Sequence, residues 1–281
     1  MILIPAVKKD EAFVEEMDSL LSDTKHFNLW WLGQSGFLLQ WKGQRIIIDP
    51  YLSDSLTRKY VNTNKPHIRM SERVVNPALL NNISVVSSSH NHTDHLDAET
   101  LVPILANNPR ITFVIPEANR YFVADRLQCD KKFPVGLNDG KSIAIGDFIF
   151  YGIPAKHNEI ERDEHGNCKF MGYVIEFGKW KIYHSGDTLY FNEMAELLKP
   201  FLVDIALLPI NGNNPAREVA GNLNCKEAAK LAKAINAQCV IPCHYDMFTF
   251  NTGDVNDFAN EAEHINQPYK VLQGGEKFEI G

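Results

Sequence analysis

Residues 90–95 read His-Asn-His-Thr-Asp-His, directly after an apolar run that ends in three serines. Imidazole and carboxylate groups are the ligands that divalent ions such as zinc and manganese prefer. His90 and His92 lie two residues apart at the end of a predicted strand, so we expect both to project to the same side. Asp94 and His95 are adjacent, where the chain turns into a helix, and must point elsewhere. Because one tetrahedral ion has little use for the second pair, the motif predicts two neighbouring metal ions.

Three further candidate ligands each follow a predicted strand: His157, Asp187 and His244. A binuclear centre needs about three protein ligands for each ion, so these residues would complete the set. A single His at a strand end is usually an ordinary polar side chain, and that is the better interpretation of either histidine taken alone. His184 lies close to Asp187 but outside the pattern, so we expect it to hydrogen-bond rather than bind metal. The remaining histidines are interpreted as ordinary: His26, His67, His165 and His264.

The hexapeptide, a lone His, Gly-Asp-Thr at 186–188 and a second lone His follow one another along the chain. This order resembles the pattern of the metallo-β-lactamase superfamily. The resemblance implies a four-layer αββα sandwich with the site at the edge of its two sheets, and two ligand groups joined by one carboxylate. One ion would be held by His90, His92 and His157, the other by Asp94, His95 and His244, with Asp187 bridging them.

Other segments resemble the L-ascorbate-6-phosphate lactonase branch of that superfamily. They are Trp30–Gly36, Leu208–Arg217, Gly221–Asn224 and Pro242–Asn251. The run His-Tyr-Asp-Met-Phe in the last segment is the most discriminating, and the resemblance covers about residues 28–255. It implies a metal-dependent hydrolase of carboxylic esters or lactones.

Asparagines crowd into two of these segments together with one arginine. Amides can hydrogen-bond to hydroxyls, and the planar guanidinium of Arg217 suits a phosphate or carboxylate. We therefore predict a small anionic sugar-like substrate. Asparagines also make turns, which is the better interpretation of any single one. The residues predicted to bind the substrate are Asn211, Arg217, Asn222, Asn224 and Lys156, which is beside His157.

The predicted chemistry is metal-assisted hydrolysis. Two divalent ions lower the pKa of a bound water from ~16 toward ~7, so that a metal-bound hydroxide attacks the lactone carbonyl at neutral pH. Asp94 or Asp187 would orient the hydroxide and accept a proton. Tyr245 or His184 could donate to the oxyanion or the leaving oxygen, and the sequence does not choose between them. Zinc and manganese both suit the ligands, and the resemblance favours manganese.

The length of 281 residues suits a single domain over 1–281, with residues 1–26 as a helical extension packed on it. Hydrophobic periodicity alone predicts only an α/β protein. Strands are predicted near 27–32, 36–41, 45–48, 85–86, 111–115, 143–153, 171–177, 180–184, 205–208 and 240–241. Helices are predicted near 9–22, 98–107, 117–127, 191–198 and 225–236, the last with Asn224 and Glu227 in a capping box.

Charge and composition exclude several classes of protein. A net charge of −7 argues against a nucleic-acid partner, and no apolar run approaches the ~20 residues of a membrane span. The first ten residues lack the order of a secretory signal. Five cysteines without paired spacing suit a reducing compartment. We therefore expect a cytoplasmic protein that binds neither nucleic acid nor membrane, and the sequence leaves homo-oligomerisation open.

Other activities of the superfamily are alternatives. A phospholipase D-like phosphodiesterase acting on N-acyl phosphatidylethanolamine shares the metal motif but should carry a membrane-facing surface. Residues 9–22, with five acidic residues and one lysine, would instead repel anionic lipid. An RNA-processing nuclease would need a basic groove, and a true β-lactamase a secretory signal. A non-catalytic metal-binding protein is disfavoured because all the ligand positions are intact.

Overall fold

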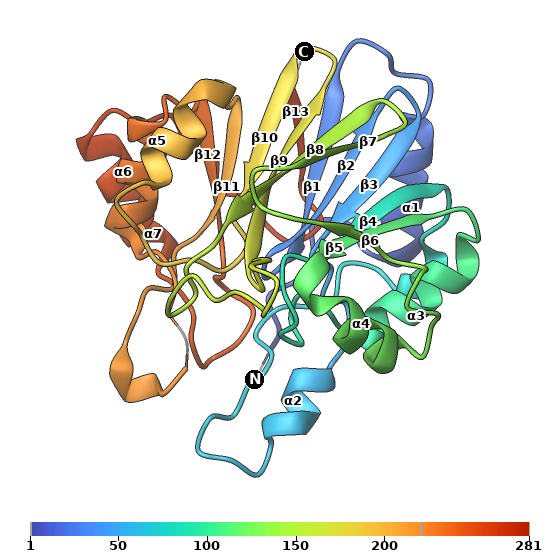
Figure 1. Cartoon of the computed structure of the whole chain (residues 1–281), viewed down its shortest axis with the longest axis horizontal. Coiled ribbons are helices and arrows are strands. Elements are labelled where there is room, and N and C mark those ends of the chain that lie inside the picture. The colour runs from blue at the N-terminus through green and yellow to red at the C-terminus, as the bar shows by residue number, and fades with distance from the viewer. Residues whose placement is uncertain (1, 220, 281) are drawn as a thin grey trace.

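The computed structural model describes residues 2–219 and 221–280 and contains two β-sheets packed face to face. Helices cover the outer faces of both sheets (Figure 1). They are α1 (Asp10–Ser19), α3 (Ala98–Asn107) and α4 (Arg120–Leu127) on one side, and α5 (Met194–Leu198), α6 (Cys225–Ala234) and α7 (Val255–His264) on the other. This is the αββα sandwich that the resemblance implied.

The first sheet is built largely from the N-terminal half of the chain. In spatial order it contains β13 (Lys277–Ile280), β1 (Phe27–Gly33), β2 (Gly36–Trp41), β3 (Gln44–Ile48), β4 (Ile83–Ser87), β5 (Thr112–Pro116) and β6 (Val135–Leu137). The pairs β3–β4, β4–β5 and β5–β6 are parallel. The carboxyl ends of these strands therefore lie at one edge of the sheet.

The second sheet comes from the C-terminal half. In spatial order it contains β12 (Cys239–Cys243), β11 (Ile205–Pro209), β10 (Trp180–His184), β9 (Met171–Phe177), β8 (Phe148–Pro154) and β7 (Ser142–Ile145). The pairs β10–β11 and β11–β12 are parallel, whereas β9 is antiparallel to both of its neighbours. Strands β8, β10, β11 and β12 therefore run in one direction and also end at one edge.

One layer of the core lies between the sheets, and the same cluster continues beneath α5, α6 and α7. A second layer lies between the first sheet and its helices. Side chains alternate along a strand, so β1 contributes to both layers. Phe27, Leu29 and Trp31 pack between the sheets, and Trp30 and Leu32 pack toward the helices. All five are buried. Because both faces of the strand are covered, its sequence is apolar apart from the buried Asn28 and does not alternate with polar residues.

The helix predicted over 9–22 is α1. Its buried Phe13 and Met17 pack against the first sheet, and Glu16 accepts a hydrogen bond from the Trp30 indole at 2.9 Å. The predicted capping box of α6 is confirmed: the Asn224 side chain accepts from the Glu227 N–H at 2.9 Å, and Glu227 accepts from the Asn224 N–H at 3.0 Å. No helix within the described ranges is long and apolar enough for a bilayer crossing.

Several elements differ from the sequence-based prediction. The single strand predicted over 143–153 is a hairpin of β7 and β8 that turns at Gly146, whose φ of +58° favours glycine. Strand β13, helix α7 and the short α2 (Ser55–Tyr60) were not predicted. In Figure 1, α2 projects away from the layered body. Short 3-10 turns occur at Pro77–Leu79, Glu117–Asn119, Lys199–Phe201 and Pro215–Arg217.

Candidate metal centre

All seven predicted ligands follow the carboxyl ends of strands. The hexapeptide 90–95 comes after β4, and His157, Asp187 and His244 come after β8, β10 and β12. A hydrogen bond joins the two sheet edges: Tyr173 on β9 donates its hydroxyl to the Ser88 carbonyl at 2.9 Å. The chain directions of the strands thus bring residues up to 154 positions apart into one site. His90 and His92 lie in a loop beyond β4, so they are not brought together by the strand pleat that the sequence suggested.

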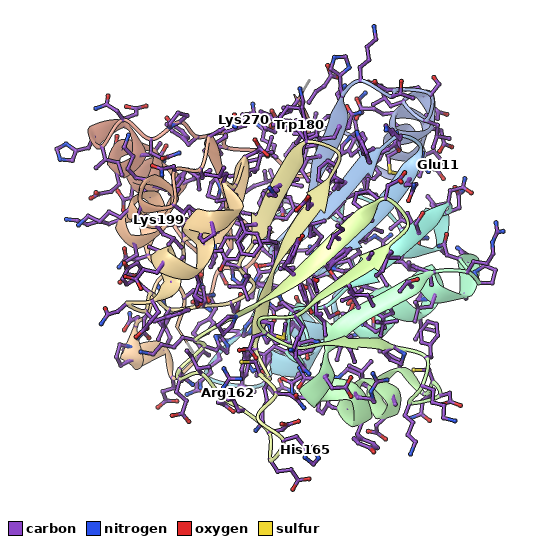
Figure 2. The ribbon with its side chains drawn as sticks, turned by 45° about the horizontal axis from the view of Figure 1, so that its top comes forward. Glu11, Arg162, His165, Trp180, Lys199 and Lys270 are labelled. Carbon is purple, nitrogen blue, oxygen red and sulfur yellow. The ribbon has the colours of Figure 1, made fainter. Side chains whose placement is uncertain are left out.

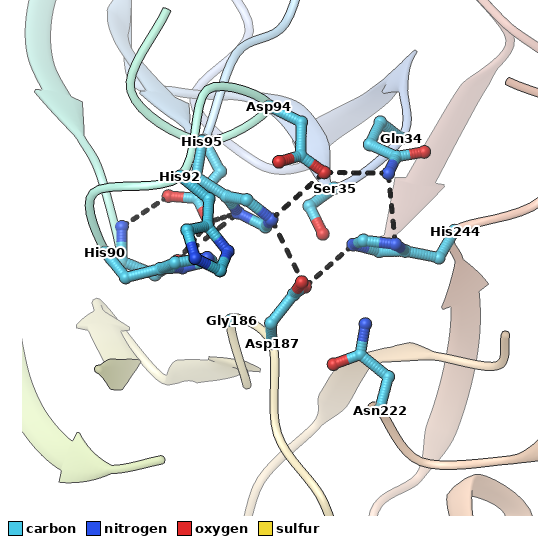
Figure 3. Close-up of polar contacts among 12 residues, drawn as sticks. Gln34, Ser35, His90, His92, Asp94, His95, Gly186, Asp187, Asn222 and His244 are labelled. Atoms are coloured by element: carbon cyan, nitrogen blue, oxygen red, sulfur yellow. Dashed lines mark hydrogen bonds and ion pairs between the residues drawn. The ribbon is translucent and has the colours of Figure 1, made fainter. Parts of the chain in front are cut away.

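The ligand atoms form two groups that contain the two predicted triads, with Asp187, predicted as a bridge, grouped with the second triad. His90, His92 and His157 form the first group, and within each group every ligand atom lies within 4.8 Å of the others. The second group contains Asp94, His95, Asp187 and His244. The groups adjoin, since the ring centroids of His90 and His95 are 4.1 Å apart. Figure 3 shows Asp187 below His95 and facing His244.

Five of the seven ligand side chains carry a buried polar atom that lacks a hydrogen-bond partner. The Asp187 Oδ1 atom is 2.8 Å from His244 Nε2 and 3.2 Å from His95 Nε2, without hydrogen-bond geometry. An unsatisfied buried polar group costs about 1–3 kcal/mol, so such a cluster is costly unless something binds it. Imidazole and carboxylate donors fit divalent cations. The buried atoms of the site without a partner are His90 Nε2, His95 Nε2, His157 Nδ1, Asp187 Oδ1 and His244 Nε2.

The two groups differ in their electrostatics. Burial lowers the pKa of His157 to about 4 and that of His90 well below its usual range, so the first group is neutral at pH 7 and has free lone pairs. In the second group burial opposes charge, yet Asp187, Asp94 and Asp49 raise the pKa of His95 well above its usual value. The facing His244 and His95 likewise outweigh burial and lower the pKa of Asp187. The carboxylates are therefore ionised and ready to bind a cation.

Asp49 is a functional residue that the sequence analysis missed. It follows β3, its side chain is fully buried, and its Oδ2 lies 2.6 Å from His95 Nδ1. Its Oδ1 accepts the Ser89 N–H at 2.7 Å, and Ser89 Oγ also donates to the carboxylate. When a metal ion displaces the Nε2 proton, a carboxylate on Nδ1 holds the remaining proton there and leaves the Nε2 lone pair for the ion. The sequence feature that could have identified Asp49 is its position directly after the predicted strand Arg45–Ile48, like that of the other candidate ligands.

Gln34 was also missed as a site residue. Its Nε2 donates to Asp94 Oδ2 at 2.9 Å and lies 3.1 Å from His244 Nδ1 (Figure 3). Its carbonyl accepts the His244 N–H at 3.2 Å. Gln34, Asp49 and His244 have φ values of +50°, +44° and +62°, which are uncommon for residues other than glycine. Such conformations concentrate at functional sites.

His184 is a positioning residue, as predicted. Its Nε2 donates to the Ser35 carbonyl at 2.9 Å, and its Nδ1 accepts the Gly186 N–H at 3.2 Å. Both ring nitrogens are therefore occupied, which argues against the alternative role of His184 as a proton donor to the substrate. Gly186 has a φ of +59°, and a Cβ there would lie 2.6 Å from the Met171 carbonyl oxygen. The turn that presents Asp187 thus requires glycine.

The prediction of Tyr245 as a proton donor is corrected by the structure. Its hydroxyl donates to the Leu272 carbonyl and accepts the Leu272 N–H, and its ring stacks on Trp31 with centroids 4.3 Å apart. Tyr245 is buried and does not line the cavity beside the ligand groups. Its role is to hold the segment before β13 against β1.

The residues predicted to bind the substrate bind mainly to one another. Arg217 Nη1 donates to the Asn211 carbonyl at 2.8 Å and to Asn251 Oδ1 at 2.7 Å. Asn211 donates to Asn251 at 3.0 Å and accepts from Asn222 at 3.1 Å. These contacts correct the prediction for Arg217, whose guanidinium holds a loop together. Figure 3 shows Asn222 beside Asp187 and His244, and its buried Oδ1 has no partner.

Two other predicted substrate contacts are also accounted for by local structure. Asn224 uses its side chain as the N-cap of α6. Lys156 uses its backbone, donating its N–H to Thr188 Oγ1 at 3.0 Å. Neither residue lines the cavity that opens onto the ligand groups. The predictions for both as substrate contacts are therefore corrected.

A cavity of about 520 Å³ opens onto both ligand groups. Its wall carries the cations Lys59, Lys65 and Arg126, and the Lys65 ammonium donates to the carbonyl of Glu218, another wall residue, at 2.6 Å. Aromatic side chains make up much of the remaining wall: Tyr60, His67, Phe122, Phe170, Phe248 and Phe250. The loop that carries His157 borders the cavity, with Arg162 and His165 near its tip in Figure 2.

Fold and ligand geometry together define a protein of the metallo-β-lactamase type. The chain belongs to the beta-lactamase superfamily, whose domain profile matches residues 28–244. A UPF0173 metal-dependent hydrolase of Caldivirga maquilingensis is 29% identical over 244 residues, which cover 86% of this chain and 92% of that relative.

Solved structures show the same fold. Igni18, a metallo hydrolase from Ignicoccus hospitalis, superposes with a TM-score of 0.66 at 23% identity, covering 92% of this chain and 99% of that protein. An isothiocyanate hydrolase from Delia radicum gut bacteria superposes with a TM-score of 0.71 at 17% identity, covering 89% and 98%.

Proposed function

We propose that this chain is a metal-dependent hydrolase that opens a sugar-phosphate lactone such as L-ascorbate 6-phosphate. The observation that carries the proposal is the cavity, which joins two groups of unpartnered metal-binding atoms to a wall containing Lys59 and Arg126. The resemblance of residues 244–248 to the lactonase branch supports a carboxylic ester as the reacting group. The name metal-dependent hydrolase carried by the relatives supports the general class.

Two divalent ions, when bound, supply a Lewis acid for the carbonyl and lower the pKa of a coordinated water. His90, His92 and His157 would hold one ion, and Asp94, His95 and His244 the other, with Asp187 reaching both. Manganese and zinc both suit these ligands, because both accept mixed imidazole and carboxylate ligands.

The carboxylates of this chain move the proton. Asp94 receives a hydrogen bond from Gln34 at 2.9 Å, which orients its free oxygen. Asp187 is held by the Gly186 turn. Either carboxylate can accept the proton of the attacking water and return it to the leaving oxygen as the ring opens. This step therefore needs no separate proton donor such as a tyrosine hydroxyl.

Lys59 and Arg126 replace Arg217 as the contacts for the anionic group of the substrate. Arg126 Nη1 donates to the Asn91 carbonyl at 2.7 Å, which fixes the guanidinium at the cavity wall and leaves other N–H groups for a ligand. Lys59 lies on α2, above Tyr60. Neither cation forms an ion pair within the described part of the chain, so both can bind a phosphate.

The test is a substrate panel with manganese or zinc added. Phosphorylated lactones, their unphosphorylated counterparts, phosphodiesters and β-lactams are compared by kcat/KM. We expect phosphorylated lactones to be the best substrates, and Arg126→Ala to lower kcat/KM for them by roughly 10- to 150-fold, as for loss of a charge-assisted contact. Lys141→Ala, a surface lysine outside the cavity lining, is the control. Preference for a phosphodiester or a β-lactam would contradict the proposal.

A further inference from the structure

The cavity contains a histidine that the sequence analysis set aside. His67 lies in the segment after α2 and lines the cavity wall. Its ring centroid is 4.5 Å from that of Tyr60, with the planes 30° apart, and 5.2 Å from those of Phe248 and Phe250. An imidazole enclosed by three aromatic rings has a fixed position and presents one edge to the cavity.

The hydrogen bonds of His67 decide which atom it offers. Its Nδ1 lies 2.7 Å from the Lys65 carbonyl, which can only accept, so Nδ1 carries the proton. The His67 carbonyl in turn accepts from the Thr57 hydroxyl at 2.6 Å, which fixes the backbone to α2. Nδ1 makes the only side-chain hydrogen bond of His67 found within residues 2–219 and 221–280, and Nε2, on a half-buried ring, is open to the cavity. In the neutral ring it is therefore an unused acceptor.

The charge state agrees with this assignment. Burial lowers the pKa of His67, the nearby Lys59 acts in the same direction, and the Lys65 carbonyl and Asp94 oppose them. The imidazole is therefore neutral at pH 7. A neutral acceptor on an aromatic wall selects a ligand that presents a hydroxyl next to an apolar face, as the face of a sugar ring does.

We propose that His67 is a specificity-determining residue that accepts, through Nε2, a hydrogen bond from a hydroxyl of a sugar-like substrate. In this arrangement Tyr60, Phe248 and Phe250 pack against the C–H face of the substrate's sugar ring. This inference rests on the proposed function. It adds how the protein recognises the part of the substrate that lies away from the reacting carbonyl. A site built to pair with a hydroxyl discriminates against an analogue that lacks it, because the protein acceptor is then left unpaired.

The test compares His67→Phe with the wild-type chain. Phenylalanine keeps the aromatic contacts and removes the acceptor. The first measurement is kcat/KM for a phosphorylated lactone and for its deoxy analogues. We expect His67→Phe to lose roughly 3- to 12-fold on the hydroxylated substrate, mainly through KM, and nothing on the analogue that lacks the selected hydroxyl. His165→Phe, at an exposed histidine near the loop tip, is the matched control.

A second measurement does not depend on turnover. The affinity of the metal-loaded protein for 6-phosphogluconate and its deoxy analogues is measured by calorimetry. We expect His67→Phe to weaken only the binding of the fully hydroxylated acid, by a similar factor. Equal affinities of the wild type and His67→Phe, or no binding to either, would overturn the inference. Lactone turnover without any effect of His67→Phe would overturn it while leaving the proposed function standing.

Discussion

Replacing Asp49 with Asn should damage the second ligand group without removing a ligand. Three donors converge on the Asp49 carboxylate: the Ser89 N–H, the Ser89 hydroxyl and His95 Nδ1. Asparagine keeps only one oxygen, so at least one donor must face an amide N–H. If that donor is His95, its proton moves to Nε2, the atom that faces Asp187 at 3.2 Å. The lone pair needed for a metal is then lost.

The expected magnitude follows from the role of such outer carboxylates. Their loss typically costs 10- to 100-fold in metal affinity, or about 1.4–2.7 kcal/mol. Affinity is measured by competition with a chromophoric chelator, titrating zinc or manganese into the metal-free protein. In Asp49→Asn we expect the ion held by His95 to bind more weakly than the other ion. Its affinity should be 10- to 100-fold lower than in the wild type.

Asp97→Asn is the matched control. Asp97 is also buried, and its carboxylate accepts from the Thr100 N–H at 3.1 Å and from the Ser55 hydroxyl at 2.9 Å as the N-cap of α3. Asparagine can still cap the helix but loses one of the two acceptor oxygens, so the variant should lower the free energy of unfolding by about 1 kcal/mol and leave metal affinity unchanged. Unchanged metal affinity in folded Asp49→Asn, or an equal loss in Asp97→Asn, would refute the assignment of Asp49.

Three further predictions follow from the site. Because burial lowers the pKa of His157 from 6.5 to about 4, the unfolded chain takes up the proton first as the pH falls. The free energy of unfolding of the metal-free protein should therefore drop between pH 7 and pH 4, by about 3 kcal/mol from this residue, and His157→Gln should lack that part in denaturant titrations with a chelator. Asp187→Ala should reduce turnover by orders of magnitude while circular dichroism shows an intact fold; near-normal turnover would count against the bridge. Arg217→Ala should lower thermal stability and affect charged and neutral substrates equally, whereas a loss confined to charged substrates would restore Arg217 as an anion contact.

The sequence predicts which candidate ligands come together because metal-binding chemistry restricts residue type and spacing. His90 and His92 stand in a dense motif, and the distant His157, Asp187 and His244 each follow an apolar strand. Strands buried on both faces are equally visible as apolar runs. These residues come together in the fold because the strands that precede them end at adjoining sheet edges.

Residues that act through long-range contacts with the ligands were not predicted. Gln34 meets His244 across 210 positions, and Asp49 meets His95 across 46. Neither lies within a dense motif like that at 90–95. His67 looked ordinary because its aromatic partners Phe248 and Phe250 come from the other end of the chain. The crowding of asparagines and Arg217 suggested substrate contacts. In the structure Asn224 caps a helix and Arg217 joins a hydrogen-bonded loop, because the same polar side chains can bind either a ligand or the backbone.

The central claim is that the chain holds two divalent ions in adjoining sites. The most direct measurement is the metal content after reconstitution and removal of free ion, determined by elemental analysis for the wild type, His157→Ala and His244→Ala. We expect close to two ions per wild-type chain and about one in each variant, since each variant loses a ligand of a different group. Less than one ion per wild-type chain, or the loss of both ions in either variant, would contradict two distinct sites.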